Sequence, residues 1–237
     1  MKRLALGIVG LAALLAAPAT AADLAARPAV KAVAPPPVFS WTGCYLGLHV
    51  GGGKQSSDYV NFGEGGFGSV GAVGGAQAGC NLQWRQFVVG VEGEYWASGL
   101  RDRNFFQSEF GSEEYSSQNR WDAAIAVRSG LAFERAFIYG KLGVVWGKFD
   151  YAFDDIDASP HAERGSATFT GVLIGAGFEY ALTDNWTTKF EYNYIDYGNK
   201  IVDFTDTECN PVCTASSFRA TVKEVKQIAK VGVNYKF

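Results

Sequence analysis

Few residues of this 237-residue sequence could do acid–base or nucleophilic chemistry, and its only histidines are His49 and His161. A catalytic serine or cysteine needs a base beside it and an acid that orients the base. No serine occurs in the glycine-flanked turn that presents the nucleophile of α/β hydrolases. A lipid-modifying acyltransferase or esterase is therefore weakly supported, and we expect no catalytic residues.

Residues that could hold a ligand are equally sparse. His161, with Tyr115 or Tyr197, could offer axial ligands to hemin, but one histidine in a polar stretch is a weak signal. Histidines and cysteines do not occur at the spacing of a metal site. No glycine-rich segment is followed by a helical pattern, as a phosphate-binding loop requires. We expect no metal and no cofactor, and hemin binding stays open as an alternative.

Composition limits the class of protein and its partners. The chain is 48% hydrophobic and 14% aromatic with 29 glycines, which is too apolar for a disordered protein. Its formal net charge of −3 provides no basic footprint, so we expect no nucleic-acid partner.

The N-terminal residues have the three parts of a secretory signal peptide. Lys2 and Arg3 precede an uncharged apolar run over residues 4–17, and small residues follow in PATAAD. The run is too short for a membrane-spanning helix. We expect a signal peptide over residues 1–22, an extended Pro/Ala-rich periplasmic linker over residues 23–40, and one folded domain over residues 41–237.

From Trp41 onward, apolar residues recur with a period of two, as in β-strands. In TGCYLGLHVGGG, for example, Cys44, Leu46, Leu48 and Val50 share one face. About eight such segments of roughly ten residues follow one another, and none shows helical spacing. The pattern predicts an all-β fold.

The connections between these segments alternate in length. Short turns are expected at residues 85–86, 134–135 and 182–185, and long polar stretches lie at residues 54–69, 98–119, 150–166 and 197–222. This rhythm is typical of an eight-stranded antiparallel up-and-down transmembrane β-barrel with short periplasmic turns and four long extracellular loops.

A soluble lipocalin-like barrel would show the same alternation with its apolar face inward. Two features favour the membrane orientation instead. Aromatic residues cluster at the strand ends like two interfacial girdles, with Trp41, Trp84, Phe87, Trp186, Tyr235 and Phe237 at one end and Tyr95, Trp121, Trp146 and Tyr194 towards the other. The opposite strand face is small and charge-balanced, as the narrow interior of a membrane barrel must be.

Four acids and four bases fall on that inner face: Glu92, Glu94, Arg128, Lys141, Glu179, Lys189, Glu191 and Lys230. Side chains just fill the interior of a barrel of about eight strands, and an unpaired buried charge is costly. We therefore favour a packed core of salt bridges. The alternative is a selectivity lining in a narrow passive channel.

Four segments resemble a known family. The first is the N-terminal run that begins with ADLAARP, continues through the proline-rich stretch and ends with FSWTGCYLGLHVGGG. The other three are GGAQAGCNLQWRQFVVGVEGE at residues 74–94, GVLIGAGFEYALTDNWTTKFEYNYIDYG at residues 171–198, and VGVNYKF at the C-terminus. The chain resembles the small porin-like outer-membrane β-barrels of alphaproteobacteria, OmpA-type barrels that include hemin-binding and immunogenic surface proteins.

The resemblance implies location in the outer membrane of a Gram-negative cell, in contact with membrane lipid and lipopolysaccharide. It also implies that Val233, Tyr235 and Phe237 form a C-terminal signal for the barrel assembly machinery. The expected protein is a monomer with a structural role, and its loops carry any contact with a host or surface ligand.

The cysteines depart from the family pattern, since Cys44 and Cys80 stand where aromatic residues are expected. An exported chain meets an oxidising compartment. Both residues fall on the lipid face at matching ends of the first two strands, close enough to bridge. Cys209 and Cys213 in TECNPVC could similarly staple the last loop. The alternative is that Cys44 and Cys80 are unpaired substitutes for aromatic residues.

Overall fold

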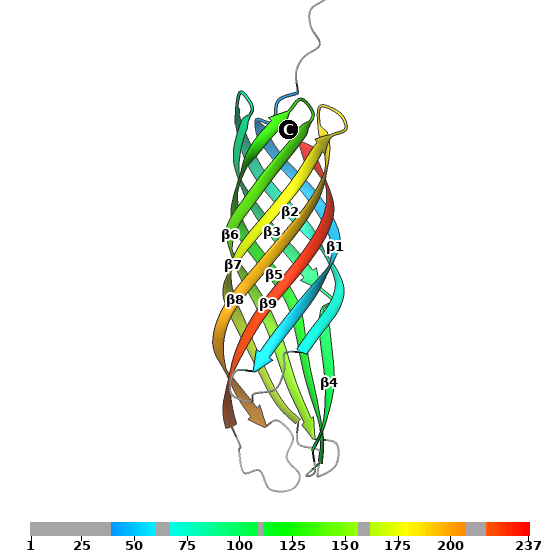
Figure 1. The fold of residues 1–237 in the computed structure, drawn as a ribbon, viewed down its shortest axis with the longest axis vertical. Helices are drawn as coiled ribbons and strands as arrows, with labels where there is room; N and C mark the ends of the chain where they lie inside the picture. The colour runs from blue at the N-terminus through cyan, green and yellow to red at the C-terminus, as the bar shows by residue number, and fades with distance from the viewer. Residues whose placement is uncertain (1–38, 60–66, 109–110, 156–161, 207–216) are drawn as a thin grey trace, which may run out of the picture. The chain divides into compact units, whose positions relative to one another are not determined.

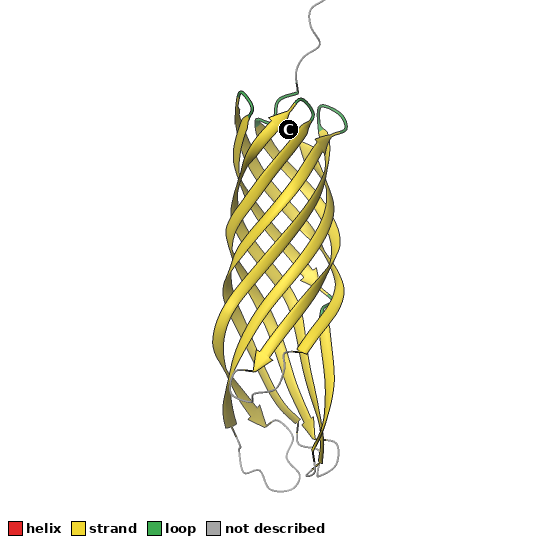
Figure 2. Cartoon of the chain, viewed as in Figure 1, coloured by secondary structure: helices red, strands yellow, loops and turns green. Residues whose placement is uncertain are grey.

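The computed structural model describes residues 39–59, 67–108, 111–155, 162–206 and 217–237, which form strands and no helix (Figures 1 and 2). The strands are β1 (Gly43–Tyr59), β2 (Phe67–Trp84), β3 (Phe87–Ser98), β4 (Arg101–Ser108), β5 (Gly111–Phe133), β6 (Ala136–Asp155), β7 (Ala162–Ala181), β8 (Trp186–Asp206) and β9 (Ser217–Lys236). In this part of the chain no helix is long and apolar enough to cross a membrane.

Antiparallel pairing closes the sheet into a ring. Apart from β3 and β4, strands that follow one another in sequence pair with each other, and β1 also pairs with β9. β3 and β4 both pair with β5 and lie in line along it, since Ala97 is opposite Trp121 and Arg101 is opposite Gln118. Counting β3 and β4 as one interrupted strand, the barrel is eight-stranded, up-and-down and antiparallel, as the alternation predicts.

The outer face of the barrel is apolar and the inner face is polar, the reverse of a soluble barrel. Leu48 and Leu142, for example, are 70% and 60% exposed on the outside. The residues that alternate with them, His49 and Lys141, are buried inside. The membrane orientation is therefore correct, and the lipocalin-like alternative is excluded.

The strands are longer than the expected ten or so residues. β5 spans 23 residues and β8 spans 21, whereas about 9–11 tilted residues cross a bilayer. The sheet continues through most of the four polar stretches, because outward residues such as Lys54 and Asp150 alternate there with buried Gln55 and Phe149. The assignment of those whole stretches to loops is wrong, and the barrel wall itself extends beyond the lipid-facing band.

The three short turns occur where the sequence predicts them, at Arg85–Gln86, Glu134–Arg135 and residues 182–185. Arg85 and Glu134 adopt positive φ angles of 56° and 51°. A positive φ at the first turn residue gives a two-residue hairpin a twist that matches its strands.

Trp41 does not belong to the outer aromatic girdle. It is 2% exposed and packs with Phe39 and Phe137 inside the short-turn end of the barrel. The reason is the alternation itself, because Trp41 lies at an even interval before Tyr45 and His49, whose side chains also face inward. The other expected girdle residues at that end, among them Trp84 and Phe237, face outward.

Cys44 and Cys80 form a disulfide between directly opposed residues of β1 and β2, with their Cα atoms 3.9 Å apart. Both face outward, so the expected pairing and face are confirmed. The expected signal peptide, the linker as far as residue 38, and Cys209 and Cys213 lie outside the described residues.

The disulfide should contribute to the stability of the barrel. It encloses a separation of 36 residues, which corresponds to as much as about 4 kcal/mol in the chain-entropy description. We expect the Cys44→Ser/Cys80→Ser protein to lose about 2–4 kcal/mol in free energy of unfolding, measured by urea titration in lipid vesicles. Reductant should destabilise the wild type more than the double variant, which keeps only Cys209 and Cys213. Equal stability of the two proteins without reductant would contradict this role.

Candidate functional site in the barrel interior

Six fully buried charges meet near the middle of the barrel and form what we call the central network: Glu92 and Glu94 of β3, Lys141 of β6, Lys189 and Glu191 of β8, and Lys230 of β9. Lys141 lies at its centre. Its Nζ is 2.8 Å from Glu92 Oε1 and 2.7 Å from Glu94 Oε2. It is also 3.1 Å from Glu191 Oε1. One ammonium group thus binds three carboxylates.

The other two lysines complete the neutralisation. Lys230 Nζ lies 2.9 Å from Glu94 and 3.1 Å from Glu191. Lys189 Nζ lies 3.2 Å from Glu92. All of these side chains have no exposed surface. Three positive and three negative charges therefore balance where water does not screen them.

Arg128 of β5 links this network to the short-turn end of the barrel. Its guanidinium pairs with Glu179 of β7 and lies 3.2 Å from Glu92. It also lies over the rings of Tyr139, at 4.3 Å, and Phe137, at 5.0 Å, as in a cation–π contact. With Arg128 and Glu179, all eight expected lumenal charges lie inside the barrel and contact one another.

Glycines on the inner face make room for the hydrogen-bond donors of the network. Tyr45 OH donates to Glu92 Oε2 at 2.6 Å. A Cβ atom at Gly79 would lie 2.4 Å from that hydroxyl. Tyr139 occupies a similar space beside Gly177. Two tyrosines that the sequence does not mark as site residues thus satisfy buried carboxylates.

A second buried ion pair lies beyond the central network, towards the long end of the barrel. Lys226 Nζ is 2.7 Å from Asp122 Oδ1, which also accepts a hydrogen bond from Tyr197. Lys226 lies 4.4 Å from the ring centroid of Phe149. The expected set of inner charges omits this pair.

Glu224 is a buried carboxyl held by neutral partners. Its oxygens accept hydrogen bonds from Ser57, at 2.8 and 2.9 Å, and from Tyr151 OH, at 2.9 Å. The apolar outer face of β9 ends at Ala229, and the outward residues level with Glu224 include Lys223. Glu224 therefore lies outside the membrane-spanning part. Burial raises its pKa from 4.5 to about 7, although the hydrogen bonds oppose the shift.

Glu224 and Lys226 are absent from the expected set because β9 begins earlier than the sequence pattern indicates. The expected polar stretch runs to residue 222, whereas β9 begins at Ser217. Its inward positions continue backward with a period of two from Lys230 through Lys226 to Glu224. Extending the alternation would have found both residues.

The central network is not suited to a metal ion, although oxygens of Glu92, Glu94 and Glu191 lie within 4.8 Å of one another. Lys141 already binds all three carboxylates. A divalent cation would have to displace or repel that ammonium group.

The histidine and tyrosine candidates for other chemistry do not form a site in the described residues. His49 is buried, with Nδ1 2.6 Å from Gln77 Oε1. Tyr197 belongs to β8, and its side chain is buried in the barrel interior. The expectation that it lies on an outer loop, where it could bind hemin, is wrong. His161 and the side chain of Tyr115 lie outside the part of the chain that the structure describes.

Aromatic side chains occupy the interior on both sides of the central network. At the short-turn end Trp41 lies 5.2 Å from Phe137, centroid to centroid. Towards the long end, Phe149 lies 5.1 Å from Phe169 and 5.3 Å from Tyr197. These rings belong to a cluster of buried residues that extends to Phe204. The geometry is that of a packed core and not of a lined pore.

Comparison with known proteins gives similarity over nearly the whole chain. The family model described as outer membrane protein beta-barrel domain matches residues 8–237. The 31 kDa outer-membrane immunogenic protein of Brucella melitensis is 34% identical, over 97% of this chain and 98% of that protein. The 22 kDa outer membrane protein of Rhizobium leguminosarum is 32% identical, over 70% and 69%.

Solved structures share the fold at low identity. The outer membrane protein OprG of Pseudomonas aeruginosa aligns with a TM-score of 0.51 at 14% identity, over 84% of this chain and 98% of that one. The outer membrane protease OmpT of Escherichia coli aligns with a TM-score of 0.51 at 12% identity, over the same shares. At these identities the likeness concerns fold alone, and it carries no protease activity to this chain.

Removing one member of the buried network should be far more costly than removing a surface charge. We expect Arg128→Ala to lower the free energy of unfolding by about 3–5 kcal/mol, because it leaves Glu179 and Glu92 uncompensated. Arg219→Ala is the matched control, since the pair of Arg219 and Asp203 is 77% and 67% exposed, and its loss should cost at most about 1 kcal/mol. Urea titration in vesicles compares the two, and equal small losses would mean that the interior is wet.

Glu224 should make the barrel less stable as pH rises. Between pH 4.5 and 7 the folded state binds the proton more tightly than the unfolded state, so the unfolding free energy falls with pH, by on the order of 3 kcal/mol, and levels off above pH 7. Glu224→Gln should remove this component and be the more stable protein at pH 8. The measurement is the difference between the two urea-titration curves from pH 4.5 to 8, and a constant difference would contradict the assignment.

Proposed function

This chain belongs to the outer membrane protein β-barrel family, and from that premise we propose that it is a non-conducting surface protein of the outer membrane. The family membership confirms the expected resemblance and the location in the outer membrane. In the proposed role, the barrel anchors the chain, and the wall and connections beyond the bilayer contact other molecules.

The observation that carries the proposal is the filled interior. Charged side chains that are fully buried lie between two sets of aromatic rings, around Trp41 at one end and Phe149 at the other. An eight-stranded barrel has just enough interior space for such side chains. A passive channel would require several of these contacts to open at once.

The length of the barrel supports a role at the cell surface. β5 through β9 each span 20 residues or more, about twice what a bilayer requires. Half of the wall is thus available above the membrane. Relatives from Brucella are named immunogenic proteins, and we propose that this chain likewise presents its outer half to the surroundings.

The proposed partners follow from the outward side chains of β9 and from its pairing with β1. Val233, Tyr235 and Phe237 face outward at alternate positions of the last strand. This arrangement supports recognition by the barrel assembly machinery. Pairing of β1 with β9 closes the ring of strands, which supports a monomer in contact with lipid and lipopolysaccharide.

We expect no steady single-channel openings when the full chain is refolded and inserted into planar bilayers. Migration on gels without boiling should be faster than after boiling, because a closed barrel resists detergent until heated. This shift, measured on the same preparation, establishes that silent protein is folded. Steady ohmic openings from the heat-modifiable form would overturn the proposal in favour of a narrow channel.

A further inference from the structure

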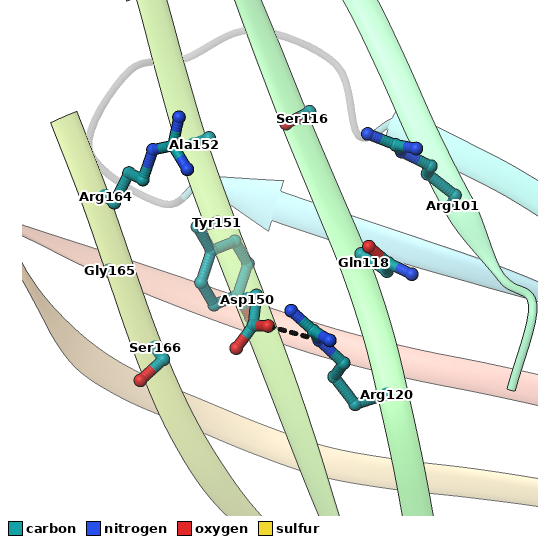
Figure 3. Close-up of a pocket in the computed structure, with 10 residues that line it drawn as sticks. All are labelled: Arg101, Ser116, Gln118, Arg120, Asp150, Tyr151, Ala152, Arg164, Gly165 and Ser166. Atoms are coloured by element: carbon teal, nitrogen blue, oxygen red, sulfur yellow. Dashed lines mark hydrogen bonds and ion pairs between the residues drawn. The ribbon is translucent and has the colours of Figure 1, made fainter. Parts of the chain in front are cut away.

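A polar groove of about 360 Å³ lies on the outer wall across β4, β5, β6 and β7 (Figure 3). Its lining includes the three arginines Arg101, Arg120 and Arg164. Figure 3 shows Ser116 and Gln118 between Arg101 on one side and Arg164 on the other. The packed interior does not explain these residues, because they face away from it.

The groove has an excess of positive charge. Among the described side chains that line it, Asp150 is the only acidic one. It pairs with Arg120 through a 2.5 Å contact from Nε to Oδ2, and these side chains are 60% and 30% exposed. Among the ion pairs of the described residues, none involves Arg101 or Arg164. Two guanidinium groups are thus left to bind an anion from outside.

Strand register brings the groove together. Arg101, Gln118, Asp150 and Ser166 lie opposite one another across four adjacent strands. Arg164 lies in the next row, opposite Ala152. The positions are set by the sheet, so the groove is a fixed part of the wall.

The groove lies at the level of lipid headgroups. Arg120 directly precedes Trp121, and Asp150 follows Trp146 by four residues on β6. Trp121 stacks on Tyr95, 6.1 Å away, as part of the outer girdle. Aromatic girdles mark the boundary between hydrocarbon and headgroups, so side chains just beyond them meet the phosphates of the outer leaflet.

We propose that this groove, which we call the arginine groove, binds a phosphate group of lipopolysaccharide at its lipid A moiety. The inference rests on the proposed function, since it requires this half of the wall to lie at the outer surface. Guanidinium groups bind phosphate through paired hydrogen bonds with fixed geometry. The side chains of Ser116, Gln118 and Ser166 add neutral hydrogen-bonding groups between the charges.

The test uses the full chain, folded in detergent micelles, titrated with lipid A that carries both phosphates and with the same lipid after dephosphorylation. Wild-type protein should bind the phosphorylated form about ten-fold more tightly or better. This comparison needs no variant, so it does not depend on how substitutions affect folding. Equal affinity for the two lipids would overturn the proposal.

Variants locate the site. Arg101→Gln/Arg164→Gln should weaken binding of phosphorylated lipid A by about ten-fold or more, while Arg219→Gln, an outward arginine already paired with Asp203, should leave it unchanged. Equal weakening by both would indicate general charge attraction and refute the groove. Heat-modifiable gel migration and conductance in planar bilayers are measured on each protein. A barrel that conducts refutes the proposed function. A folded barrel that does not conduct and shows no preference for phosphorylated lipid A refutes only this site.

Discussion

Lys141 contacts three buried carboxylates, and the packing of the whole interior depends on that contact. Alternation on a lipid-facing strand sends every second side chain inward, and several of those side chains are acidic. Burying charge is costly unless it is paired and hydrogen-bonded. The ammonium group of Lys141, supported by Lys189 and Lys230, permits the carboxylates to approach within 4.8 Å. A slip of one residue in any participating strand would turn its charges towards lipid, so the network also selects the register.

Much of the fold follows from the sequence, because the alternation of apolar and polar residues can be read within each strand by itself. An alternation of two residues assigns each side chain to a face without knowledge of the neighbouring strand, which is why the eight inner charges were correctly placed inside. The short turns then fix which strands are neighbours. β1 and β2 are joined by a longer connection, and there the alternation places Cys44 and Cys80 on the outer face while the antiparallel register brings them opposite each other.

Other features depend on tertiary contacts that the pattern does not contain. Strands continue through polar segments as long as a neighbour supplies ladder hydrogen bonds, so their ends cannot be read from hydrophobicity alone. Lys226 and Glu224 escape the expected set of inner charges for this reason. Trp41 resembles a girdle residue by type and by its place near a strand end, whereas the period of two counted back from Tyr45 turns it inward.

The disulfide has a mechanical consequence for the barrel. β1 has two neighbours, and only β2 is joined to it covalently. On its other side, β1 meets β9 at the seam where the two ends of the folded chain come together, through hydrogen bonds and side-chain packing. A lateral force on the ring would thus find its weaker boundary at the seam, with β1 moving together with β2 as one hairpin.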